Sequence, residues 1–115
     1  MSATQHQDFR PFEVHVSSGS EGVRVAPAGE IDLATARQLQ ERIDALLGGS
    51  TRLVLDLGDV TFMDSTGVRL VLELVRAAAR DGWELAVTRM PHAVHRVFEL
   101  SGVLDAIPLR DPEVG

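Results

Sequence analysis

The chain has 115 residues, of which 44% are hydrophobic and 24% are charged, so it fits one globular domain with a single core. It contains no cysteine, which excludes disulfides and thiolate metal sites, and a net charge of −6 without a basic run disfavours nucleic acids and anionic membranes. No apolar run approaches the roughly 20 residues of a membrane span, and residues 1–8 lack the features of a signal peptide. We therefore expect a cytoplasmic protein.

A β-hairpin is predicted at the start of the chain. Apolar and polar residues alternate over residues 12–17 and again over 23–25, on either side of the turn-forming segment 18–22. Proline cannot donate a hydrogen bond to a β ladder, so the second strand is expected to stop near Pro27.

A helix and a central strand are expected next. Asp32 can cap a helix over residues 33–47, where apolar residues recur at helical spacing, and the glycine pair at 48–49 can end it. The nearly continuous apolar run at residues 52–57 is typical of a strand that is buried on both faces.

A strand-to-helix turn is predicted at residues 60–68. Asp64 stands where an N-cap is needed, and Ser65 and Thr66 begin the helix. Free backbone N–H groups and the positive end of the helix dipole favour a negative group close to Ser65. Serine is common at helix starts, so these residues alone favour a structural role for Ser65 and leave a regulatory role open.

The helix that begins near Ser65 has an unusually wide apolar surface. Such a surface exceeds what packing on a sheet requires, so either another helix of the chain or a partner covers part of it. Packing within the chain is the simpler expectation. The two apolar stripes comprise Val68, Val71, Leu72, Val75 and Ala79, and Leu70, Leu74 and Ala77.

The last third of the chain predicts a strand at residues 83–88, a short helix from Pro91 to Gly102 and a final strand at 106–109. Pro108 would make this final strand an edge strand. We expect an α/β domain over residues 11–110, between a flexible leader (1–10) and a C-terminal tail (111–115).

The order of the elements also indicates the sheet and its site. Strands and helices alternate as β-β-α-β-α-β-α-β, and the long crossovers imply parallel pairing after the initial hairpin. Asp32 and Asp64 each follow a strand and precede a helix. We expect them on the same edge of the sheet, with Asp32 near Ser65.

The residues offer little support for other chemistries. A Ser-His-Asp hydrolase is not indicated, because none of the four histidines is well placed and the GxSxG sequence of such enzymes is absent. His92 and His95 are three residues apart and could share a metal, but no carboxylate completes an obvious ligand set. Carboxylates often hold Mg²⁺, and three lie close together in the sequence: Asp56, Asp59 and Asp64. A structural role is simpler for each, because they stand at a strand end, a turn and a helix cap. No Walker A or GxGxxG sequence occurs. We expect neither a metal site nor enzymatic activity.

Four segments of the chain carry a family resemblance. They are Gly29-Glu-Ile-Asp32, Leu53-Val-Leu-Asp-Leu57, Phe62-Met-Asp-Ser-Thr-Gly67 and Val97-Phe-Glu-Leu-Ser-Gly102. In this order and spacing they resemble the bacterial anti-sigma factor antagonists, the single-domain members of the STAS family. No single one of these motifs would identify the family, but four motifs at the expected order and spacing are specific for it. The resemblance implies a STAS-like mixed β-sheet with flanking helices.

The resemblance also implies a function. In that family a partner that is both protein kinase and anti-sigma factor phosphorylates the serine of the Asp-Ser-Ser/Thr-Gly motif, which corresponds to Ser65. The unphosphorylated antagonist binds the anti-sigma factor and frees the sigma factor; phosphorylation ends that binding, and a serine phosphatase restores it. The family's acidic residue at the head of the first helix matches Asp32, while Asp64, Thr66 and Gly67 surround the phosphosite. ATP and Mg²⁺ belong to the kinase, so this chain itself needs no cofactor.

Two features depart from the family pattern. Relatives often have a small residue where this chain has Arg69, one helical turn beyond Ser65. Arg69 can pair with a phosphate on Ser65, can determine which partner binds, or can simply be solvated. Many relatives also continue into a C-terminal helix, and its absence would leave part of the second apolar stripe for solvent or for a homodimer partner. The alternative function is a STAS scaffold or ligand-sensing module of a larger signalling assembly.

Overall fold

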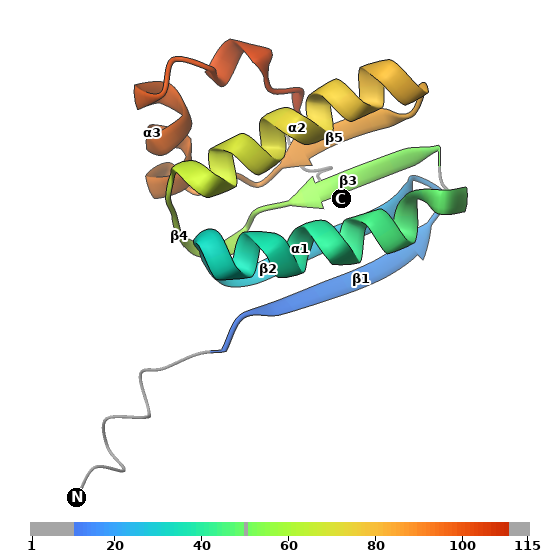
Figure 1. Ribbon diagram of the computed structural model, residues 1–115, viewed down its shortest axis with the longest axis horizontal. Coiled ribbons are helices and arrows are strands. Elements are labelled where there is room, and N and C mark those ends of the chain that lie inside the picture. Colours follow the sequence, from blue (N-terminus) through green and yellow to red (C-terminus); the bar gives the residue numbers. More distant parts are fainter. Residues whose placement is uncertain (1–10, 50, 111–115) are drawn as a thin grey trace, which may run out of the picture.

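Residues 11–49 and 51–110 are described by the computed structural model, and they form a six-stranded mixed sheet with three α-helices (Figure 1). The expected leader and tail lie outside these residues. In chain order the elements are β1 (Glu13–Gly19), β2 (Gly22–Ile31), α1 (Leu33–Leu46), β3 (Arg52–Asp56), β4 (Asp59–Met63), α2 (Ser65–Asp81), β5 (Glu84–Thr88), α3 (His92–Leu100) and β6 (Leu109–Arg110). Short 3₁₀ turns lie at Leu47–Gly49 and Leu104–Ala106.

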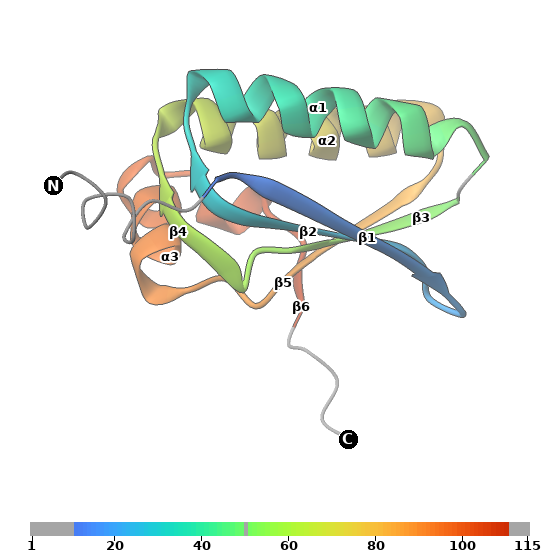
Figure 2. The same cartoon turned by 90° about the horizontal axis from the view of Figure 1, so that it is seen from below.

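The topology of the sheet confirms the predicted α/β class. β1 pairs with β2 antiparallel, and all further pairs are parallel, giving the strand order β1-β2-β3-β5-β6 with β4 beside β2. Figure 2 shows α1 and α2 side by side over one face of this sheet. α3 packs at one end, against β4 and the start of α2. Among the described residues, no helix combines the length and the apolar character needed to cross a membrane.

The prediction that the second strand stops near Pro27 was wrong, because β2 continues to Ile31. The first part of β2 pairs with β3 as far as Val25, and its last part pairs with β4 from Ala28 onwards. Pro27 lies between these two ladders, where neither neighbouring strand needs the N–H that proline lacks. The strand β4 itself was not predicted, since a strand-to-helix turn was expected at residues 60–68; the burial of the β4 residues does not alternate regularly.

The core lies between the sheet and the two long helices. Leu53 and Leu55 of the central strand β3, and Leu57 just after it, belong to this core and are fully buried. On α2, the expected second stripe is buried within the chain, with Leu70 and Leu74 only 5% and 2% exposed. Packing within the chain thus accounts for these residues, and they need no dimer partner.

The C-terminal part of the domain differs in detail from the prediction. The strand expected at residues 106–109 is instead a 3₁₀ turn followed by the two-residue β6, which begins after Pro108. β6 does lie at the sheet edge, beside β5, as the proline predicted.

Candidate functional site

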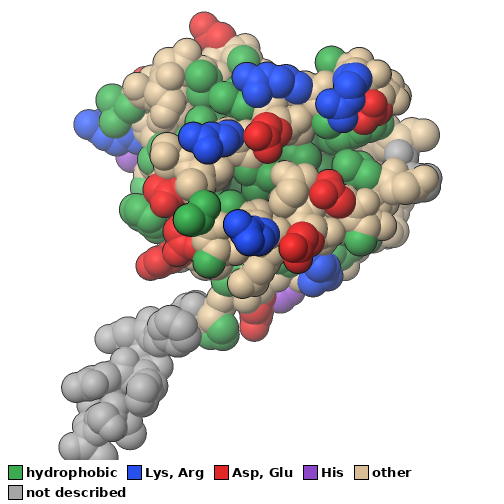
Figure 3. All heavy atoms as spheres, in the orientation of Figure 1, with side chains coloured by type: hydrophobic (Ala, Val, Ile, Leu, Met, Phe, Trp, Pro, Cys, Tyr) green, Lys and Arg blue, Asp and Glu red, His purple; other side chains and the backbone are tan. Residues whose placement is uncertain are grey.

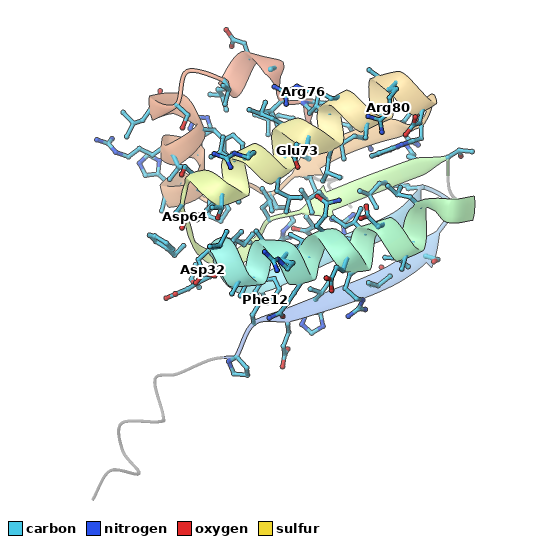
Figure 4. All side chains as sticks on the ribbon, in the orientation of Figure 1. Phe12, Asp32, Asp64, Glu73, Arg76 and Arg80 are labelled. Carbon is cyan, nitrogen blue, oxygen red and sulfur yellow. The ribbon has the colours of Figure 1, made fainter. Side chains whose placement is uncertain are left out.

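The predicted meeting point of the two helix starts is present at one edge of the sheet. β2 and β4 end together, since Ile31 is in register with Met63 and the backbone N–H of Asp64 donates to the carbonyl of Ile31 at 3.1 Å. The next residue on each strand is the aspartate that heads α1 or α2. Figure 4 shows Asp32 and Asp64 at this shared end of the molecule. The structure therefore brings the two predicted carboxylates to neighbouring strand ends.

Asp64 caps α2 and also holds its neighbour Thr66. Its carboxylate accepts the backbone N–H of Thr66 at 2.9 Å and a short hydrogen bond from the Thr66 hydroxyl. This satisfies one of the free N–H groups at the start of the helix. The Thr66 hydroxyl is half-buried and committed to the cap.

Ser65 occupies a different position in the same motif. It is the first residue of α2, its side chain is exposed, and its hydroxyl takes no part in the Asp64 cap. No acidic side chain lies in the first turn of α2 after the cap. Ser65 thus presents an accessible hydroxyl at the positive end of a 17-residue helix.

Asp32 forms a complete capping box at the start of α1. Its carboxylate accepts the backbone N–H groups of Ala34 and Thr35, both at 3.1 Å, and the Thr35 hydroxyl accepts the Asp32 N–H at 2.8 Å. The hydrogen bond from the Thr35 backbone is the main cause that lowers the pKa of Asp32 below its ordinary value of 3.8. Asp32 therefore contributes a fixed negative charge at this edge at neutral pH.

Gly67 is required by space rather than by an unusual backbone angle. It is buried, and a Cβ there would lie 2.9 Å from the Met63 sulfur and 3.0 Å from a methyl carbon of Ile31. A glycine at this position lets the first turn of α2 lie directly on the ends of β2 and β4. The motif glycine thus sets the position of Ser65 relative to the sheet.

Arg69 lies one turn beyond Ser65 on α2 and is exposed. It belongs to none of the ion pairs found among the described residues. Further along the helix, Glu73, Arg76 and Arg80 point outward from the sheet (Figure 4). Figure 3 shows arginines and carboxylates interspersed over the face that carries α1 and α2, without a large patch of one sign.

Two exposed apolar side chains flank the two caps, and sequence reasoning missed both. Leu33 directly follows Asp32 and is 69% exposed; Phe62 precedes Asp64 by two residues and is 48% exposed. The register between β2 and β4 shifts beside Phe62, which breaks the inside-outside alternation of β4. Only this irregularity, which depends on the partner strand, turns Phe62 outward.

Two of the three carboxylates considered for a magnesium site, Asp56 and Asp64, have separate structural partners. Asp56 accepts the N–H of Gly58 at 2.9 Å and pairs with Arg24 and Arg89, at 3.0 and 3.5 Å. These contacts connect the first half of β2 with the carboxyl ends of β3 and β5. Within residues 11–49 and 51–110, no cluster of three or more metal-binding side chains occurs.

A mixed sheet with two long helices on one face, and an Asp-Ser-Thr-Gly helix start at the strand ends, defines the class of this protein. The chain belongs to the STAS domain family: the family described as Mlab, STAS domain, matches residues 14–110.

Relatives within this class are regulatory proteins. The chain is 29% identical over 98 residues to the anti-sigma-B factor antagonist of Bacillus subtilis (strain 168), covering 85% of this chain and 90% of the relative. It is 30% identical over 89 residues to the anti-sigma F factor antagonist of Paenibacillus polymyxa, covering 76% of each. The solved structure of the Bacillus cell fate determinant SpoIIAA in its phosphorylated form matches with a TM-score of 0.68 and 25% identity, covering 90% of this chain and 92% of that chain.

Proposed function

We propose that this chain is an anti-sigma factor antagonist whose binding is switched off by phosphorylation of Ser65. The observation that carries the proposal is the exposed Ser65 hydroxyl at the start of α2, beside the strand ends that carry Asp32 and Asp64. A relative of the same fold has been solved in a phosphorylated form, which supports a phosphorylation switch in this family.

The geometry favours Ser65 over its neighbour as the phosphate acceptor. A kinase needs a hydroxyl that it can reach and that is free to attack. The Thr66 hydroxyl is half-buried and donates to Asp64, so its phosphorylation would break the cap of α2. Phosphorylation of Ser65 leaves this cap in place.

Phosphate at Ser65 would change the surface rather than the fold. A phosphoserine carries about −1.5 to −2 charges at neutral pH, and the positive end of a helix stabilises such a charge by roughly 0.3–1 kcal/mol. The added charge lies beside the carboxylates of Asp32 and Asp64, at an edge that a partner must desolvate. Each 1.4 kcal/mol lost in the complex weakens binding about tenfold.

The binding surface in this proposal includes the exposed Leu33 and Phe62. An apolar pair next to two capped helix starts gives a partner area to bury, and aromatic anchors often dominate such contacts. A dianion at the same edge would have to be desolvated in the complex, which explains how one phosphate can end binding. Arg69 adds either a partner for the phosphate or a contact that selects the anti-sigma factor.

The proposed partners are an anti-sigma factor that is also a serine kinase, and a serine phosphatase that acts on the modified chain. Since these partners control transcription, we place the chain in the cytoplasm. In this proposal the chain acts by binding, in keeping with its relatives, which are named as antagonists. The alternative of a scaffold or ligand-sensing module is not favoured, because the relatives that match most of the chain are antagonists.

The test is phosphorylation in vitro. The chain is incubated with ATP and the anti-sigma kinases of its source cell, and the modified residue is mapped by mass spectrometry. Phosphate should appear on Ser65 in the wild type, disappear in Ser65→Ala, and persist in the control Thr66→Ser, which keeps the hydroxyl that donates to the cap. Undiminished phosphate incorporation in Ser65→Ala would overturn the assignment of the site.

A further inference from the structure

A groove lies away from the Ser65 edge, between the edge strand β1 and the outer side of α1. Its volume is about 690 Å³, and its lining includes Phe12 and Val14 at the strand and Gln38, Glu41 and Arg42 on the helix. Figure 1 shows α1 running beside β1 along this edge of the sheet, and Figure 4 places Phe12 at its start. α1 packs on β2 and α2, so the apolar side chains of β1 are only partly covered.

The two strands at the ends of the order β1-β2-β3-β5-β6 are protected to very different degrees. β6 has only two residues and follows Pro108, a combination that discourages pairing with another strand. β1 has seven residues, contains no proline, and keeps a regular register with β2 along its whole length. No described strand pairs with its outer side. An edge this long and regular is a template for strand addition.

The backbone groups that β1 offers can be identified. In an antiparallel pair, residues alternate between those that exchange both hydrogen bonds and those that direct both groups away. Pro27 has no N–H, so its pair with Val14 is of the second type, and the Val16–Val25 pair two residues on is too. The N–H and C=O groups of Val14, Val16 and Ser18 therefore point out of the edge.

We propose that a second copy of this chain occupies this edge, with the two β1 strands antiparallel about a two-fold axis perpendicular to the sheet. The two-fold axis pairs the outer side of β1 in one copy with the same side of β1 in the other, so the assembly closes at two copies. The partly exposed Phe12, Val14 and Val16 of both copies then form one apolar floor beneath the two α1 helices.

The charges on the groove wall fit a second copy. Strands lie about 4.8 Å apart, so two α1 helices that each pack over β2 lie about 14 Å from one another across the paired strands. Glu41 and Arg42 are adjacent and exposed on α1, and neither belongs to an ion pair among the described residues. In the proposed dimer the antiparallel α1 helices turn the Glu41–Arg42 segments of the two copies toward each other, and a carboxylate beside an arginine on each groove wall makes the surface complementary to itself.

Sedimentation velocity of the full chain, over concentrations up to about 1 mM, tests the proposal. The wild type should show a monomer–dimer equilibrium. Val16→Pro removes an N–H that points outward and leaves the bonds to β2, so it should be monomeric. Arg42→Glu places like charges across the axis and should raise the dissociation constant about tenfold, since two symmetric pairs are reversed. The double change Glu41→Arg with Arg42→Glu should restore dimerisation.

Two controls make the result decisive. Glu99→Arg reverses an exposed charge on α3, outside the groove, and should dimerise as the wild type does. Thermal unfolding of each variant separates lost pairing from lost folding, and if Val16→Pro does not fold, the Arg42 variants decide. A wild type that stays monomeric throughout would overturn the proposal. So would an Arg42→Glu variant that dimerises as tightly as the wild type.

Discussion

Substitutions of Asp64 separate its two contributions to the Ser65 edge, which are the cap of α2 and a negative charge. Asparagine keeps an oxygen that accepts the N–H and hydroxyl of Thr66, whereas alanine removes both hydrogen bonds. Asp64→Asn therefore changes the charge with little change in the cap, and Asp64→Ala changes both.

The expected magnitudes follow from these contacts. Loss of an N-cap costs about 0.5–2 kcal/mol, and asparagine is about as good a cap as aspartate. Because Asp64 also holds the half-buried Thr66 hydroxyl, we expect the upper half of this range for Asp64→Ala, about 1–2 kcal/mol. For a domain of this size, that lowers Tm by about 4–8 °C. Asp64→Asn loses only the interaction of the charge with the helix dipole, about 0.3–1 kcal/mol, so its Tm should fall by no more than about 4 °C.

Urea and thermal unfolding of the wild type and both variants measure these differences, with the exposed Asp105→Ala as a matched control. The control should lie within about 0.5 kcal/mol of the wild type. If Asp64→Asn were destabilised as much as Asp64→Ala, the charge and not the hydrogen bonds would hold the start of α2, and the capping argument would be refuted.

Three further predictions concern stability. Gly67→Ala should lower the free energy of unfolding, measured in urea, by about 1–2 kcal/mol, because overlap of the added methyl group with Met63 outweighs the better helix propensity of alanine. A variant as stable as the wild type, or more stable, would contradict the close approach of Gly67 to Met63. Asp56→Ala should lower the free energy of unfolding by about 1–3 kcal/mol in the same assay, because the Asp56 side chain is only 15% exposed and Arg24 and Arg89 lose their partner. Asp59 is exposed and serves as the control; an equal loss in Asp59→Ala would contradict the role of these ion pairs. For Asp32, the pKa in the folded chain lies below the unfolded value, so the ionised carboxylate adds stability above about pH 4, and this stability is lost as the pH falls through the folded pKa. The free energies of unfolding of the wild type and Asp32→Asn, measured between about pH 6 and pH 2, should therefore converge at the acid end. A difference that stays constant with pH would contradict this.

Local rules were sufficient for much of the fold. The hairpin, the central apolar strand and the start of α2 each depend on residues close together in sequence, and all are present in the structure. The placement of Asp32 and Asp64 on one edge followed from parallel pairing alone. The wide apolar surface of α2 was also correctly assigned to packing within the chain.

Two of the misses have a common physical origin in the pairing between β2 and its parallel neighbours. Pro27 is tolerated inside β2 only because β3 ends and β4 begins beside it, and no local pattern reveals that gap. The outward turn of Phe62 likewise depends on a register shift against β2. Within the Asp-Ser-Thr-Gly motif, only the family resemblance pointed to Ser65; the structure adds that the Thr66 hydroxyl is bound to Asp64.

Binding of an anti-sigma factor to the unmodified chain and to the chain with phosphoserine at position 65 tests the switch most directly. The partner is captured from the source cells with the unmodified chain, and both affinities are measured by isothermal titration calorimetry. We predict that phosphorylation weakens binding at least about tenfold, while Tm changes by no more than about 4 °C. Equal affinities of the two forms for the same partner would contradict the proposed function.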